Sequence, residues 1–326
     1  MFGYQFSGLG HKKFAFFLRV SGTQNPSPTE GLLGNKPIIC GGEILEDDWN
    51  GDGIQRSRLE LENNFIVGKS MYYIQLLEKR FCAASVALNK TNLWVTGGSR
   101  ESFSKDLSST ELISLHQPPV KGQDLPFTVA YHSMTLIDSK TIFLIGGMQD
   151  SNISKNTWII DPTKNFEIKC GPDLNEARSA HSCSKMKIDE KTYLVVAGGF
   201  GNGKYHDSVE ILDTTSYDQG WTFGKNFTFV KITKKLKCYY TFSLGPKLPR
   251  KIAHSTMVCS PTEKGVIIIG GRIELFSDFN ALIELSGYSK ESLKWTTLKQ
   301  KLRSPRCWHV SFLIPESIMK MFRMTI

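Results

Sequence analysis

The chain has 326 residues, of which 40% are apolar and 11% aromatic, and a formal net charge of +9. This composition supplies enough apolar side chain for a sizeable core and argues against global disorder. No apolar run approaches the about 20 residues of a membrane-spanning helix, and no basic helix or run of aromatic residues with arginines accompanies the charge, so neither a membrane span nor nucleic-acid binding is expected.

The first 35 residues follow no clear pattern. The apolar run 14–18 is too short for the core of a signal peptide, and no clear cleavage site follows it. We expect this run to be a buried strand, and residues 16–22 to be a degraded strand of an additional repeat. Residues 1–35 are therefore interpreted as an irregular N-terminal segment or a degraded repeat.

From residue 36 onward, one pattern occurs five times: four or five mostly β-branched or aromatic residues followed by two glycines. Such a run predicts a strand buried on both faces. The glycines suit a backbone with φ > 0 or one that lies close against a neighbour. The second glycines are 56, 49, 52 and 72 residues apart, and the five pairs are Gly41-Gly42, Gly97-Gly98, Gly146-Gly147, Gly198-Gly199 and Gly270-Gly271.

Each period has the same internal layout of four strands, with the glycine pair after the second. Turn residues such as Asp161-Pro162 separate the strands. The expected strands are 110–115 as the third strand of the second copy, 131–137, 141–145, 156–160 and 165–169 in the third, 181–188, 192–197, 208–213 and 220–223 in the fourth, and 254–259, 265–269, 281–286 and 293–298 in the fifth.

The long step of 72 residues contains the segment 225–245, which is rich in Lys, Phe, Tyr and Thr and has no acidic residue. Removing these 21 residues leaves a step of 51. The segment also holds five lysines, so the net charge without it falls from +9 to +4. Two interpretations stay open: an insertion looped out at the edge of a repeat, as from an unspliced intron, and a genuine long loop with a binding role.

Residues 307–313 have the pattern of another first strand, in register with 252–255, but no second strand follows. Repeat proteins that form rings remove their open edges by pairing strands from the two termini. We therefore expect this strand to complete the repeat begun near residues 36–42. The alternative is a truncated chain, and residues 314–326 are an off-pattern C-terminal tail.

Two further marks accompany the glycine pairs. Trp221 and Trp295 follow Gly199 and Gly271 by 22 to 24 residues, and Leu/Pro/Arg-rich links at 174–178, 248–250 and 302–306 lead into the next repeat. With the period near 50 residues, these marks resemble the kelch repeat. The resemblance covers residues 80–313 and implies an all-β fold, a kelch-type β-propeller of five or six four-stranded blades over residues 36–313.

The resemblance implies a protein–protein interaction module, because a propeller presents inter-strand loops on one face around a central channel. The chain has no counterpart of the BTB and BACK domains of kelch substrate adaptors, so recruitment of a ubiquitin ligase is not expected. We expect a monomer that binds a protein or peptide; arginines and an aromatic at the face suit an acidic peptide. The residues just after the glycine pairs, which line that face in the adaptors, are Glu43, Ser99, Arg100, Met148, Gln149, Phe200 and Arg272.

Two alternatives to this function stay open: a secreted kelch protein that binds ligands or glycans, and a carbohydrate enzyme of the galactose oxidase or sialic-acid mutarotase type. No set of copper ligands maps onto the chain, so we expect neither an enzyme nor a cofactor. Leaving out Cys238, six cysteines remain, which permits three disulfides, and sequons begin at Asn89 and Asn152. Cytoplasmic and secreted locations are both compatible with the sequence.

Four histidines, His132, His181, His254 and His309, are predicted to occupy the same place in successive first strands. Equivalent positions of a ring lie on different repeats, too far apart to bind one zinc ion, so we expect these histidines to satisfy backbone groups. The acidic stretch 47–53 lacks the glutamate that a calcium loop needs at its twelfth position and is expected to be a turn. No metal site is expected.

Overall fold

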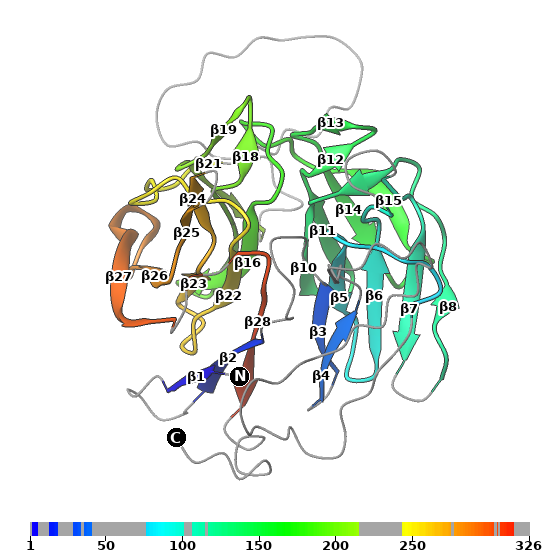
Figure 1. Cartoon of the computed structure of the whole chain (residues 1–326), viewed down its shortest axis with the longest axis horizontal. Helices are drawn as coiled ribbons and strands as arrows, with labels where there is room; N and C mark the ends of the chain where they lie inside the picture. Colours follow the sequence, from blue (N-terminus) through cyan, green and yellow to red (C-terminus); the bar gives the residue numbers. More distant parts are fainter. Residues whose placement is uncertain are drawn as a thin grey trace, which may run out of the picture.

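The computed structural model describes residues 2–5, 13–18, 29–33, 36–40, 76–100, 106–114, 117–214, 243–274, 277–302, 305 and 307–315. In these ranges the chain is all-β, built from several antiparallel sheets, with one 3₁₀ turn at Lys290–Ser292 (Figure 1). No helix in them is long and apolar enough to cross a membrane. Gly41, Gly42, Glu43, the acidic stretch 47–53 and Trp221 lie outside the described residues.

Within the described ranges, four antiparallel sheets have four strands each, in chain order from a first to an outer strand. Sheet 2 contains β5 (Ala84–Ala87), β6 (Asn92–Thr96), β7 (Thr110–Ser114) and β8 (Val120–Lys121). Sheet 3 contains β10 (Ser133–Asp138), β11 (Thr141–Ile145), β14 (Thr157–Asp161) and β15 (Glu167–Cys170). Sheet 4 contains β16 (Ser182–Ile188), β17 (Lys191–Ala197), β20 (Val209–Asp213) and β21 (Ser243–Leu244). Sheet 5 contains β22 (Thr256–Cys259), β23 (Gly265–Ile269), β26 (Ala281–Ser286) and β27 (Lys294–Lys301).

The expected strand positions agree with these sheets to within a few residues, and three strands (β11, β23 and β26) have the expected bounds. The fourth strand of sheet 4 differs from its predicted position. The expected strand 220–223 lies outside the described residues, and the outer position of sheet 4 belongs to β21, which pairs Leu244 with Glu210 and Ser243 with Ile211. The end of the segment 225–245 is therefore not looped out but forms part of a sheet.

Strands near the two termini pair with each other. β28 (Val310–Pro315) lies beside β2 (Lys13–Leu18), which pairs with β1 (Phe2–Gln5), and we call these three strands sheet 6. β3 (Thr29–Leu33) pairs with β4 (Lys36–Cys40) as sheet 1. The prediction that the C-terminal strand completes the repeat at 36–42 is wrong in its partner, since β28 hydrogen-bonds with the apolar run near residue 14.

The second strand of each four-stranded sheet is buried on both faces, as its apolar run predicts. In β11, Ile142 and Leu144 pack with Trp94 of sheet 2, whereas the alternate residues Phe143 and Ile145 pack with Val196 of sheet 4. Successive side chains of a strand point to opposite faces, so one strand supplies the core on both sides. Each fully buried aliphatic side chain contributes roughly 1.5–3 kcal/mol.

The first strands of the sheets lie next to one another. β5 contacts β10, β10 contacts β16, and β16 contacts β22. The series continues through the terminal sheets, because β22 contacts β28, β28 contacts β3, and β3 contacts β5. Figure 1 shows the sheets following one another around the molecule, with sheets 6 and 1 side by side at the bottom of the view.

Candidate functional site

The glycine pairs hold neighbouring sheets together. Both glycines have positive φ in all four described pairs, from +52° to +106°. A Cβ on Gly146 would lie 2.6 Å from the carbonyl oxygen of Arg178, in the link into the next sheet, and a Cβ on Gly147 would lie 2.7 Å from Cβ of His132. The first glycine therefore touches the following repeat and the second touches the first strand of its own sheet, which only glycine allows.

Gly146→Ala is expected to lower the free energy of unfolding by at least about 2 kcal/mol, since strain at positive φ adds to the clash with the Arg178 carbonyl. Gly203→Ala is the matched control: Gly203 has φ +72° but nothing within 4 Å of its Cβ position, so only the strain of about 1 kcal/mol remains. Urea unfolding of both variants measures the difference, and equal losses would contradict the close approach.

A belt of backbone hydrogen bonds runs from repeat to repeat just beyond the glycine pairs. We call its five residues the belt; all have φ between 48° and 56°, and they are Cys82, Tyr131, Ala180, His254 and Trp308. From Tyr131 onward, the amide of each belt residue donates to the carbonyl of the belt residue before it, at 2.9 Å for the first three bonds and 3.0 Å for the fourth. The positive φ ends the extended strand here, so the first strands start about two residues later than predicted.

The residue after each of the last four belt residues joins neighbouring sheets through its side chain. Nε2 of His132 lies 2.8 Å from Oγ1 of Thr96, and Nε2 of His181 lies 2.8 Å from Oγ of Ser133. His309 similarly lies 3.2 Å from Thr256. Through Nε2 these three histidines contact hydroxyl groups, which the sequence did not predict. His181 in addition forms a hydrogen bond with the backbone of Arg178, the kind of contact that was expected.

The fourth histidine does not share this position. His254 is itself a belt residue, and Ser255 occupies the place of His181, with its Oγ 2.6 Å from Oγ of Ser182. The alignment of His254 with the other three is therefore wrong by one residue. No cluster of three potential metal ligands occurs in the part of the chain that the structure describes.

The residues after the glycine pairs lie beside the belt, where three short hairpins project. The hairpins are β12 (Met148–Gln149) with β13 (Asn152–Ile153), β18 (Phe200–Gly201) with β19 (Lys204–Tyr205), and β24 (Arg272–Glu274) with β25 (Ser277–Asp278). Ser99, Met148, Phe200 and Arg272 each bridge to the residue before the belt residue of their own sheet. We call this side of the molecule the hairpin face.

The predicted binding residues differ in exposure. Ser99 and Gln149 are buried, and Gln149 donates through Nε2 to the Gly146 carbonyl at 3.1 Å, a contact within the glycine turn. Met148, Phe200 and Arg272 are half-buried, and Arg100, which pairs with Glu78, is exposed. The hairpin face thus brings Met148, Phe200, Arg272 and Arg100 toward solvent.

A group of aromatic and charged side chains surrounds Arg272. Its guanidinium lies 4.4 Å from the ring centroid of Trp308, and its Nε donates to Oδ1 of Asp278 at 2.9 Å. The Trp308 ring lies 4.6 Å from that of His254, which in turn lies edge-on to Tyr131 at 6.4 Å. We call Tyr131, His254, Arg272, Asp278 and Trp308 the mouth cluster.

The charges and protons of the mouth cluster are fixed by these contacts. Burial has the largest single effect and would lower the pKa of Arg272, but the hydrogen bond to Asp278 and the Coulombic effects of Cys307, Asp278 and Tyr205 together raise it. Burial lowers the pKa of His254 to about 3, so its ring is neutral. Because the Trp308 indole N–H donates to Nδ1 of His254, the ring proton sits on Nε2.

Sequence reasoning found Arg272 but missed the other members of the mouth cluster. Asp278 follows Arg272 by six residues with a turn between, a spacing that a two-stranded hairpin would bring together. Trp308 follows Arg306-Cys307 at the start of a first strand, in the place of Tyr131 and Ala180. Tyr131, His254 and Trp308 were missed because their contacts depend on the belt conformation, which the sequence does not reveal.

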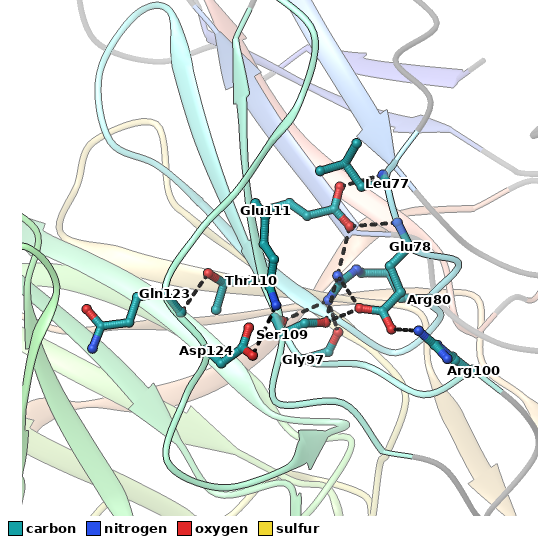
Figure 2. A network of polar contacts seen from close by, with 11 residues as sticks. Leu77, Glu78, Arg80, Gly97, Arg100, Ser109, Thr110, Glu111, Gln123 and Asp124 are labelled. Atoms are coloured by element: carbon teal, nitrogen blue, oxygen red, sulfur yellow. Dashed lines mark hydrogen bonds and ion pairs between the residues drawn. The ribbon is translucent and has the colours of Figure 1, made fainter.

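A polar network anchors the link that precedes Cys82 of the belt (Figure 2). Arg80 is fully buried; Nη1 donates to the Gly97 carbonyl at 2.6 Å, and Nη2 donates to Oε1 of Glu111 at 2.8 Å. The Glu111 carboxylate also accepts the amides of Leu77 and Glu78. It therefore ties the link to the third strand of sheet 2.

Sheet 4 repeats this network with Arg178, which donates to the Gly198 carbonyl at 2.8 Å and to Oε1 of Glu210 at 2.6 Å. In the repeats that follow these two, the position of Arg80 and Arg178 is taken by the apolar residues Val129 and Ile252. The backbone bond at this position is the same in both kinds of link, because the amides of Gly98, Gly147 and Gly199 donate to the carbonyls of Val129, Arg178 and Ile252. Polar and apolar links therefore alternate along the chain.

No protein-family model matches the chain, and no curated protein matches it. Among the cysteines with described side chains, none of the permitted disulfides forms between any two of Cys82, Cys170, Cys183, Cys259 and Cys307.

Proposed function

We propose that the chain is a kelch-type β-propeller of six blades that acts as a binding module for a protein or peptide. The partner contacts the hairpin face around the mouth cluster. The observation that carries this proposal is the gathering of aromatic and arginine side chains, from three different sheets, at one point of that face. Tyrosine, tryptophan and arginine are the residue types that dominate binding at protein interfaces.

The series of contacts between first strands supports the propeller and its blade count. It passes through six strands, β3, β5, β10, β16, β22 and β28, and returns to its start. Pairing of β28 with β2 would then close the ring in the manner of other propellers, leaving no open edge between the first and last repeats. The glycine pairs and the Leu/Pro/Arg-rich links resemble the kelch pattern at the level of the sequence.

The chemistry of the mouth favours a partner segment with mixed character over a purely acidic one. Asp278 already compensates the charge of Arg272, and Glu78 that of Arg100. Phe200 and Tyr205, whose rings lie 5.7 Å apart on the neighbouring hairpin, add half-buried aromatic surface. An apolar or aromatic anchor flanked by hydrogen-bonding groups fits this surface better than a run of carboxylates.

The test is a selection of displayed random peptides on the full chain, followed by affinity measurements on variants. Phe200→Ala and Trp308→Ala are each expected to raise the Kd of a selected peptide at least tenfold. This corresponds to a loss of about 1.4 kcal/mol or more of binding free energy, as expected when an anchor side chain is truncated.

Tyr288→Ala is the control for this selection. Tyr288 is 91% exposed and lies in the turn after β26, at the end of sheet 5 away from Arg272, because Gly265 pairs with Ser286 and Ile269 with Leu282. Unchanged affinity in the two face variants, or an equal loss in Tyr288→Ala, would overturn the assignment of the hairpin face.

A further inference from the structure

A cavity of about 180 Å³ lies behind the mouth cluster, among the first strands. Its walls run from the belt residues Tyr131 and His254 to Met134 and Met257, three residues farther along β10 and β22. One water molecule needs only about 10–15 Å³ of such space. The cavity therefore has room for a small organic molecule.

The cavity wall is polar but uncharged. None of its described lining residues is Asp, Glu, Lys or Arg. Hydroxyl groups of Ser133, Ser182 and Ser255 come from successive sheets, and Met134 and Met257 add apolar surface. An ion would gain no opposite charge here, whereas a neutral molecule with hydroxyl groups on an apolar ring has partners for both parts.

One histidine of the wall, His132, is buried and neutral. His132 is 7% exposed and lines the cavity, and its Nε2 contacts Thr96, but its Nδ1 is buried with no hydrogen-bond partner among the described residues. Buried polar atoms are rarely left without a partner. Burial lowers the pKa of His132 to about 3, so the neutral ring is able to hydrogen-bond a hydroxyl group.

We infer that this cavity, which shares Tyr131 and His254 with the mouth cluster, binds a neutral polyhydroxylated ring, such as a cyclitol or a hexose, independently of the partner proposed above. The hydroxyl groups of the ligand pair with the serines, and its C–H face packs on the methionines. A failure of peptide binding at the hairpin face would leave this inference standing.

Saturation-transfer NMR on the full chain tests the site with four probes: myo-inositol, D-glucose, D-glucuronate and D-glucosamine, each at millimolar concentration. Transfer to the two uncharged rings and none to the charged analogues is expected, since the wall offers no counter-charge. Transfer to none of the four, or equal transfer to charged and uncharged rings, would overturn the inference.

Two variants locate the binding. Met257→Phe fills the cavity and is expected to abolish transfer, and Ser255→Ala removes one hydroxyl group and is expected to raise the Kd about threefold to tenfold. Tyr288→Ala, far from the cavity, should bind as the parent chain does. If Met257→Phe fails to fold, the Ser255→Ala titration decides; an unchanged Kd there would place the ligand elsewhere and refute the site.

Discussion

Arg178→Met is expected to lower the free energy of unfolding by about 3–5 kcal/mol, the usual cost of leaving one partner of a buried ion pair alone. Arg178 and Glu210 both have fully buried side chains, 2.6 Å apart. Without the guanidinium, the Glu210 carboxylate keeps its bonds to the amides of Asn175 and Glu176 but loses its buried counter-charge. Chemical denaturation of the variant measures the loss.

Another sheet of the chain suggests a double variant in which an apolar pair replaces the ion pair of Arg178 and Glu210. In sheet 5 the positions of Arg178 and Glu210 are taken by Ile252 and Ile283, both fully buried. The double variant Arg178→Ile/Glu210→Ile should therefore be more stable than Arg178→Met, because an apolar pair replaces an ion pair with little loss.

Arg250→Met is the control for this comparison, an exposed link arginine whose nearest aromatic contact is Phe279 at 6.0 Å. It should cost under about 1 kcal/mol. Equal losses of unfolding free energy for Arg178→Met and Arg250→Met would show that the buried network stabilises the chain no more than an exposed arginine does.

The stability of the chain is expected to fall steeply as the pH drops from 6.5 toward 3. Burial lowers the pKa of His132, His181 and His254 to about 3 each, from an ordinary value of 6.5. The unfolded chain therefore binds more protons in this window, and acid favours unfolding. Each histidine contributes about 1.4 kcal/mol per pH unit, or about 6 kcal/mol for the three together at pH 5.

Urea midpoints at pH 7.5 and pH 5.0 measure this dependence. His132→Gln keeps a hydrogen-bonding group beside Thr96 but does not titrate, so its midpoint should shift about one third less than that of the parent chain. A parent midpoint that is the same at both pH values would refute the burial of neutral histidines.

Local features of the fold were readable from the sequence. The runs that end at Gly146 and Gly270 predict buried strands, because four apolar residues in a row leave neither face of the strand polar. The glycines predict the turn, because few other residues adopt positive φ. The bounds of β11 and β23 follow from these two signals alone.

Features that depend on contact between repeats were not readable. The belt places five different residue types at positive φ, and backbone bonds join each to a residue at least 49 positions away. The tripeptide Ala-His-Ser occurs at 180–182 and at 253–255, yet its histidine stands after the belt in one copy and on it in the other. The pairing of β2 with β28 joins opposite ends of the chain, where no period is present to align.

In each belt residue, the backbone makes the junction between repeats, and the side chain takes no part in that hydrogen bond. The bonds of the belt run through backbone groups, so the same junction is made by a cysteine, a tyrosine, an alanine, a histidine and a tryptophan. Three of those side chains, of Tyr131, His254 and Trp308, belong to the mouth cluster. Substitution can therefore change the proposed binding surface, one repeat at a time, while the junctions between repeats keep the same hydrogen bonds. Such a framework is well suited to acquiring new ligands by single steps of divergence.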